Sequence, residues 1–317
     1  MGPRTTAASE PPSVVVSIKP VHALVAGVME GVASPMLLVD GSASPHAYSL
    51  KPSQAGALAE ADLVVWIGEG FEFFLEAPME SLVPEGHGLE LADLSTIALL
   101  PVREGGVWDA LDHGAGGDTD DAHTDEHSDH DRADEEAGHD HAHDGYDPHI
   151  WLDPDHAVAI VAAVAERLRS IDPTNAGLYG DNESALIERL HALDTEMQTM
   201  LAPLRDIPFI VFHDAYQYFE RHYGLHAAGS ITLDPEQKPG AARLAAIRNR
   251  LGEGGVVCAF AEPGFDGALL ETATEGTDVR LGRLDPEGIA LEPGPALYPA
   301  LIRNLAASLA ECLAPTG

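Results

Sequence analysis

The chain has 317 residues, 45% of them hydrophobic, and a formal net charge of −35 from 17 basic and 52 acidic side chains. This length exceeds the usual size of one domain and predicts two, each with a sizeable core. So acidic a surface repels nucleic-acid phosphates and anionic lipid, and no run approaches the roughly 18 apolar residues of a membrane span, so we expect neither nucleic-acid binding nor a transmembrane anchor.

The first part of the chain alternates short apolar runs with helical patterns. Residues 1–12 are polar, lack the apolar run of a signal peptide and predict a disordered N-terminus. Strands are then predicted at 13–18, 34–39 and 63–67, and helices at 21–31, 51–61 and 71–80. Strands that alternate with helices indicate βαβ units and a parallel sheet.

The composition changes between Asp112 and Asp144, where thirteen acidic residues and seven histidines accompany a single basic residue, Arg132. This segment cannot bury enough surface to offset its ordering entropy, so we predict a disordered loop over 112–145. Histidine-rich tracts bind metal ions, and the loop is therefore either a set of weak metal sites or a solvated charged segment without a role.

The second part of the chain repeats the alternation. An amphipathic helix is predicted at 155–170, and a longer helical pattern at 174–201 spans roughly 40 Å, enough to cross between domains. Further strands are predicted at 209–212, 227–231 and 256–260, and helices at 216–223, 241–252 and 298–312. We predict an N-terminal α/β lobe at 13–172, a linker helix at 173–202 and a C-terminal α/β lobe at 203–317.

Three of the sixteen histidines stand beside predicted strand ends or in loops: His46 in SPHAY, His149 in DPHIWLDP and His213 after the strand 209–212. Ligands bind at the carboxyl ends of strands in open α/β sheets, and neutral imidazoles suit Zn²⁺. In a zinc site the other nitrogen of each ring needs a hydrogen-bond partner. Each histidine taken alone also reads as an ordinary polar loop residue, and periodicity does not show that the three converge.

Cys258 and Cys312 are the two cysteines of the chain. From the residues alone they are either two buried thiols, as in a cytosolic protein, or one disulfide, as in an exported protein.

Around these histidines the sequence resembles the ZnuA-type zinc-binding proteins of bacterial ABC importers, within the metal-specific cluster of solute-binding proteins. The matching stretches cover nearly all of the chain outside the acidic loop, and their combination is highly specific. They are SIKPVHALVAGV at 17–28, SPHAYSLKPSQAGALAEADLVVWIGEGFE at 44–72, DPHIWLDP at 147–154, VFHDAYQYFERHYGL at 211–225, AEPGFDG at 261–267 and LDPEG at 284–288.

The resemblance implies two similar α/β lobes joined by one long rigid helix, with one tightly bound Zn²⁺ in the cleft between them. It implies His46, His149 and His213 as ligands and a disulfide between Cys258 and Cys312. It also implies a monomer in the periplasm that delivers zinc to an ABC transporter permease. A periplasmic zinc chaperone is a further candidate partner.

The fourth ligand position departs from part of the family. Some zinc-binding members carry a Glu before the first His, where this chain has Pro45, which cannot ligate. Other members of the cluster use an Asp from the second lobe, which matches Asp285. The fourth ligand is therefore Asp285 or water, with Asp285 favoured. Manganese-binding relatives place a carboxylate where His213 stands, and three nitrogens favour zinc over manganese.

Two other functions remain open from the sequence. Three protein ligands plus water is also the pattern of a zinc hydrolase, which would need a general base beside the water. Glu262 is the one appealing candidate, and we interpret it as a partner of a metal ligand or a structural residue, so we expect no enzymatic activity. A zinc-storage or adhesin-type protein would depend on the loop 112–145 for its capacity.

Overall fold

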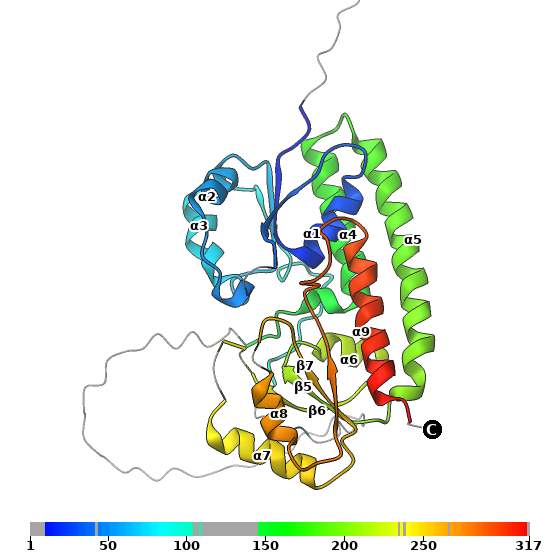
Figure 1. Ribbon diagram of the computed structural model, residues 1–317. Helices are drawn as coiled ribbons and strands as arrows, with labels where there is room; N and C mark the ends of the chain where they lie inside the picture. Colours follow the sequence, from blue (N-terminus) through cyan, green and yellow to red (C-terminus); the bar gives the residue numbers. More distant parts are fainter. Residues whose placement is uncertain are drawn as a thin grey trace, which may run out of the picture.

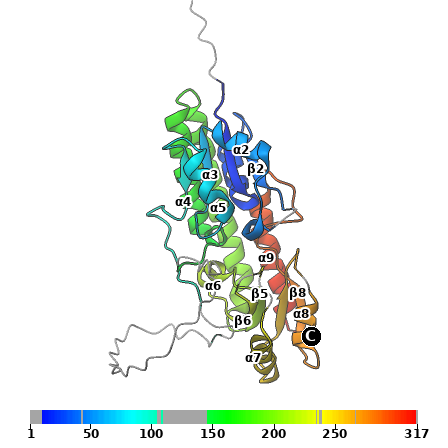
Figure 2. The same cartoon turned by 90° about the vertical axis from the view of Figure 1, so that its left-hand side faces the viewer.

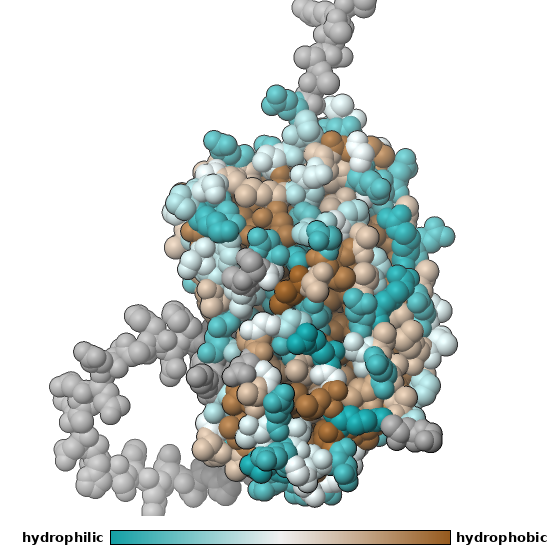
Figure 3. Space-filling model, viewed as in Figure 1, coloured by the Kyte–Doolittle hydropathy of each residue, from teal (hydrophilic) through white to brown (hydrophobic). Residues whose placement is uncertain are grey.

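The computed structural model describes residues 10–41, 44–103, 108, 145–233, 235–236, 239–265 and 267–315. The predicted disordered N-terminus (1–12) and histidine-rich loop (112–145) therefore lie outside the described residues, apart from 10–12 and Gly145. Within the described part of the chain, no helix is long and apolar enough to cross a membrane. Polar and apolar side chains are interspersed over both lobes on the face drawn in Figure 3.

The N-terminal lobe contains a four-stranded sheet with the order β2-β1-β3-β4, in which all neighbours are parallel. Its elements are β1 (Val14–Ile18), α1 (Lys19–Val28), β2 (Met36–Val39), α2 (Pro52–Ala59), β3 (Leu63–Trp66), α3 (Glu76–Ser81) and β4 (Gly88–Glu90). The two central strands, β1 and β3, are buried at every position. This is typical of parallel strands that are covered on both faces.

Two long helices come next in the chain, α4 (Pro154–Ile171), which belongs to the first lobe, and α5 (Ala176–Leu201). Asp153 caps α4, because its side chain accepts a hydrogen bond from the backbone nitrogen of Asp155 at 2.9 Å, and Pro154 occupies the first turn. Figure 1 shows α5 running alongside both lobes, and it contacts α1 and α4 of the first lobe and α6 of the second.

The C-terminal lobe has a second all-parallel sheet, with the order β6-β5-β7-β8. Its elements are β5 (Phe209–His213), α6 (Gln217–Tyr223), β6 (Ala227–Thr232), α7 (Ala241–Gly252), β7 (Cys258–Ala261), α8 (Ala268–Thr274), β8 (Arg280–Arg283) and α9 (Leu297–Leu313). In β8, a Cβ on Gly282 would lie 2.5 Å from the ring of Phe260, so only glycine fits at this position. The two sheets with their flanking helices confirm the predicted fold class.

The closing helix α9 packs against α1 of the N-terminal lobe, against α5 and against β8. A disulfide between Cys258 in β7 and Cys312 in α9, with 6.1 Å between the Cα atoms, fastens the helix to the second sheet. The view turned by 90° separates the lobe that carries α2 and α3 from the lobe that carries β5, β6 and β8, with α9 extending between them (Figure 2). A second helix therefore crosses the junction beside α5.

Alternate side chains of β5 point to different cores. Phe209 and Val211 belong to a large apolar core that continues through α9, α5 and α4 into the first sheet. Ile210 and Phe212 face a smaller core with Ile247 of α7. The period of two along the strand thus divides the second sheet between two cores.

Candidate metal centre

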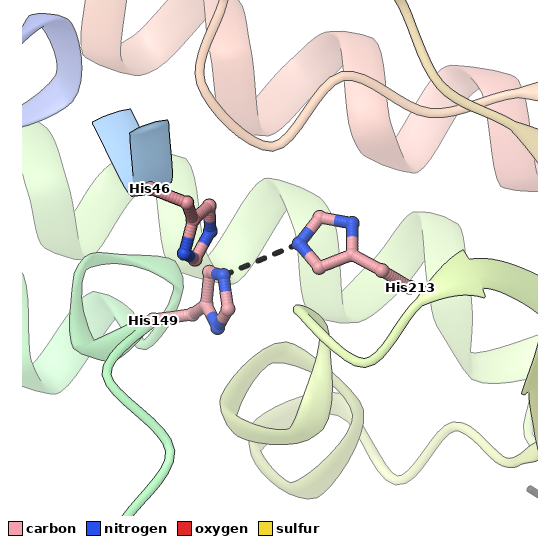
Figure 4. A group of neighbouring side chains, drawn as sticks. All are labelled: His46, His149 and His213. Atoms are coloured by element: carbon pink, nitrogen blue, oxygen red, sulfur yellow. Dashed lines mark hydrogen bonds between the residues drawn. The ribbon is translucent and has the colours of Figure 1, made fainter. Parts of the chain in front are cut away.

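Three histidines from separate segments meet between the lobes. His46 lies in the 3₁₀ turn Pro45–Ala47 after β2, His149 precedes the 3₁₀ turn Ile150–Leu152, and His213 is the last residue of β5. Each offers a ring nitrogen, and these atoms lie within 4.8 Å of one another. Figure 4 shows His46 and His149 on one side and His213 pointing toward them from the other.

The spacing of two ring nitrogens fits a tetrahedral ion. The Nε2 atoms of His149 and His213 are 3.3 Å apart. Two nitrogens that each lie about 2.05 Å from one tetrahedral Zn²⁺ would be roughly 3.3 Å apart. Both rings therefore already have the separation that a shared zinc ion requires.

Strand register places Glu262 beside His213. In the parallel pair β5 and β7, Phe209 stands opposite Cys258 and Ile210 opposite Ala259. Continuing this register past the strand ends brings position 213 next to position 262. The Glu262 carboxylate accepts two hydrogen bonds from His213, one from Nδ1 at 2.5 Å and one from the backbone nitrogen at 3.2 Å.

A second carboxylate orients His149 in the same way. Oδ1 of Asp147 accepts hydrogen bonds from Nδ1 of His149 at 2.7 Å and from its backbone nitrogen at 3.0 Å. With both Nδ1 atoms held by buried carboxylates, the Nε2 atoms of His149 and His213 remain directed at each other. Such partners fix the ring orientation and increase ligand basicity in histidine metal sites.

Aromatic rings enclose the three imidazoles. Phe71 meets His46 edge to face at 4.8 Å between ring centroids, Trp151 lies 5.2 Å from His149, and Phe265 lies 6.1 Å from His213. His149 and His213 are buried, whereas His46 is partly exposed. His149 and His213 are thus shielded from solvent, and the site is accessible on the side of His46.

Burial shifts the acid–base equilibria of the site. Burial by itself lowers the pKa of His213. The charge and hydrogen bond of Glu262 raise it by more than burial lowers it, so the pKa lies above its ordinary value. Burial also raises the pKa of Asp147 to about 7, although the hydrogen bond from His149 lowers it. Because the pKa of His213 is raised, a cation that binds this ring competes with a proton more strongly than it would at an ordinary imidazole.

The predicted fourth ligand, Asp285, is not one of the three grouped residues. Its Oδ1 accepts hydrogen bonds from the backbone nitrogens of Glu287, at 3.2 Å, and Gly288, at 2.8 Å. Glu287 carried no signal in the sequence. Burial raises its pKa to about 8, although the nearby His213 lowers it. Glu287 is thus the carboxylate of this loop that interacts with His213, and Asp285 as the fourth ligand stays a prediction.

A second group of possible ligands among the described residues is Asp153, Asp155 and His222. Here both ring nitrogens of His222 are engaged, Nδ1 with Asp153 at 3.1 Å and Nε2 with Asp194 at 2.8 Å. Burial lowers the pKa of His222, but these two hydrogen bonds raise it to about 9. The ring is therefore a cation between carboxylates, which makes this group an ion-pair network.

Replacing Glu262 with Gln is expected to weaken zinc binding by about 10- to 100-fold, the usual effect of removing the partner of a metal-binding histidine. The fold should survive, because an amide has the shape of the carboxylate. Glu196→Gln is the matched control, since Glu196 is exposed and pairs with Arg303 on the α5–α9 surface. Competition with a zinc indicator dye measures both affinities, and wild-type affinity in E262Q would contradict the role assigned to this carboxylate.

The two lobes, the helices that cross between them and the three convergent imidazoles together define the class of the protein. It is a two-lobed α/β binding protein whose candidate site suits a transition-metal ion. The chain belongs to the family of the zinc-uptake complex component A, periplasmic (ZnuA), which matches residues 14–312.

Individual relatives agree with this assignment. The high-affinity zinc uptake system protein ZnuA of Brucella abortus (strain 2308) is 47% identical over 310 residues, which cover 96% of this chain and 93% of that protein. The protein of the same name from Paracoccus denitrificans is 41% identical, covering 97% and 93%. A crystal structure of ZnuA superposes with a TM-score of 0.74 at 25% identity and covers 96% of this chain and 100% of that one.

Proposed function

We propose that this protein is the periplasmic zinc-capture component of an ABC importer. It binds one Zn²⁺ between its lobes through His46, His149 and His213 and delivers the ion to a membrane permease for uptake. The observation that carries the proposal is the convergence of three imidazoles whose ligand atoms lie within 4.8 Å of one another. Membership of the zinc-uptake family supports the choice of ion and of transport partner.

The ligand set favours zinc on chemical grounds. Imidazole nitrogens suit Zn²⁺, whereas Mn²⁺ and Mg²⁺ prefer oxygen-rich sites. The carboxylates that contact these rings bind Nδ1, so they act as partners of the ligands. Asp285 or a water molecule completes the tetrahedron.

Zinc capture requires no chemical step, and we propose that the protein catalyses none. A hydrolytic zinc site needs a carboxylate or imidazole free to take a proton from the metal-bound water. Both oxygens of Glu262, the candidate base, accept hydrogen bonds from His213. This engagement supports a binding role over a hydrolytic one.

The disulfide supports an oxidising compartment, since such bonds persist in the periplasm and are rare in the cytosol. We place the protein there as a monomer, with the permease as its main partner and a zinc chaperone as a further one.

The deciding experiment is a calorimetric titration of metal-free protein with Zn²⁺, for the full chain and for a variant that lacks residues 112–144. One tight site should remain after the deletion, because the three histidines lie outside the deleted segment. Weaker additional sites should disappear with it. The His191→Ala variant, altered at an exposed position of α5, controls for nonspecific loss of a histidine.

Loss of tight binding together with the segment 112–144 would overturn the proposal. The protein would then be a zinc buffer or storage protein on an importer-like scaffold. Turnover of ester or phosphate substrates that vanishes in His213→Ala would instead support a hydrolase.

Zinc affinity is expected to fall as the pH falls. Zinc binds the neutral imidazole, so a proton on His213 competes with the ion, and the pKa of this residue is raised in the metal-free site. The decline should therefore set in at a higher pH than for an ordinary imidazole, and below that onset the affinity should fall about tenfold per pH unit for each competing proton.

Competition titrations at several pH values measure this decline, and calorimetry in buffers of different ionisation enthalpy counts the released protons. The E262Q variant provides the comparison, because burial of His213 without the carboxylate's charge moves the competition to lower pH. An affinity that is constant from neutral pH to about pH 5 would argue against ligation by three histidines.

A further inference from the structure

Arg103 binds two carboxylates at once. Its Nε lies 3.0 Å from each carboxylate oxygen of Asp214, and its Nη2 also contacts Asp214. Glu220 accepts hydrogen bonds from Nη1 at 3.1 Å and from Nη2 at 2.9 Å. The ring of Trp108 covers the guanidinium at 3.8 Å. All three guanidinium nitrogens are thus engaged, and the two carboxylates are only 6% and 7% exposed.

Arg103 lies at the end of a segment that pairs, through backbone hydrogen bonds, with the residues just before His149. The nitrogen of Val102 donates to the carbonyl of Gly145 at 3.3 Å, and the nitrogen of Asp147 donates to the carbonyl of Leu100 at 2.8 Å. Asp147 is the residue that orients His149. The position of Arg103 is therefore coupled to that of His149 through a short two-stranded segment, 100–103 with 145–147.

The two carboxylates belong to the other ligand segment. Asp214 directly follows His213, and Glu220 lies in α6 and also accepts a hydrogen bond from the backbone nitrogen of Ala227, the first residue of β6. Arg103 thus connects the segment of His149 with the segment of His213 on the C-terminal lobe.

We propose that Arg103 is a positioning residue that fixes His149 and His213 at the separation that zinc needs, and so controls how fast the ion leaves. This inference rests on the proposed zinc-binding function. A guanidinium is planar and binds carboxylates in fixed two-pronged geometry, so it constrains both position and angle. A site held in its binding geometry before the ion arrives loses less free energy to ordering when the ion binds.

Lysine separates positioning from simple charge balance. Arg103→Lys keeps one positive charge beside Asp214 and Glu220, but an ammonium on a flexible stem cannot hold both carboxylates in a fixed orientation. If Arg103 only neutralised its neighbours, lysine would suffice. If Arg103 positions the ligand segments, lysine should fail although the protein remains folded.

The test uses the full chain with Arg103→Lys and Arg103→Met, and with Arg303→Lys as matched control. Arg303 also contacts a carboxylate through Nε and Nη2, but its partner Glu196 lies on the exposed α5–α9 surface. Zinc release into excess chelator gives the dissociation rate. The visible spectrum of the Co²⁺-loaded protein reports the ligand geometry, and thermal unfolding of metal-free protein reports the fold.

Arg103→Lys should release zinc about 10- to 100-fold faster than wild type and change the Co²⁺ spectrum, as expected when a residue that orients metal ligands is altered. The control should match wild type. A folded Arg103→Lys variant with wild-type rate and spectrum would overturn the proposal. If the methionine variant fails to fold, the lysine variant still decides. A wild-type protein that binds no zinc would contradict the proposed function itself.

Discussion

His213→Ala is expected to weaken zinc binding by at least about a thousandfold, or roughly 4 kcal/mol, which is more than removal of a ligand's hydrogen-bond partner costs. The variant leaves two of the three clustered nitrogens and also removes the group that Glu262 holds. Zinc should therefore raise the unfolding temperature of the wild type strongly and that of the variant little, since stabilisation by a ligand follows its affinity. Differential scanning calorimetry with and without Zn²⁺ measures both effects.

The exposed histidine of α5 serves as the control, because His191→Ala changes the histidine content without touching the cluster. A His149→Ala variant should behave like His213→Ala, since the Nε2 atoms of these two residues lie 3.3 Å apart. Tight one-to-one binding that persists in both cluster variants would mean that the functional site lies elsewhere in the chain.

Removal of the disulfide should lower the free energy of unfolding by about 4 kcal/mol. The bond closes a segment with a sequence separation of 54 residues, and the chain-entropy relation for a loop of this length gives that figure. The double variant Cys258→Ala, Cys312→Ala leaves no free thiol and places a small apolar side chain at each of these two buried positions. Urea denaturation of the oxidised wild type and the variant measures the difference.

Zinc affinity should change little in the folded double variant. Cys258 is the first residue of β7, whereas Glu262 follows the other end of that strand beside His213. A stability loss below about 1 kcal/mol would show that the unfolded chain is already restricted without the bond.

The sequence predicted the layout of both lobes because their central strands are short, mostly apolar runs. The runs VVVSI and LVVW are buried throughout, and helices alternate with them in the order that a parallel sheet requires. The boundaries of α7 were predicted as the structure has them, and those of α4 to within one residue at each end.

One edge strand of each sheet, β4 and β8, was missed for a physical reason. Strand β4 has three residues, Gly-Leu-Glu, and β8 reads Arg-Leu-Gly-Arg with partly or fully exposed side chains. Short, polar strands that border solvent carry no apolar pattern to detect. The helix α8 also escaped prediction, and the single helix predicted at 71–80 is a 3₁₀ turn, Phe73–Leu75, followed by α3.

The three histidines could be named from the sequence only because their flanking motifs resemble a known family. They come from positions 46, 149 and 213, and no local pattern relates such distant loops. Glu262 was singled out, yet its contact with His213 depends on the register of β5 and β7. Arg103 stands beside the acidic segment and carried no signal, because its partners become neighbours only when the lobes are assembled.

The division of apolar side chains along β5 bears on how the molecule unfolds. One core runs without interruption from the first sheet through α5 and α9 to the inner face of the second sheet, while the core under α7 is separate. The cooperative unit of folding therefore does not coincide with either lobe. Both lobes should melt together in one transition, and the outer layer of the second sheet should open first, exchanging its amide hydrogens ahead of the remainder.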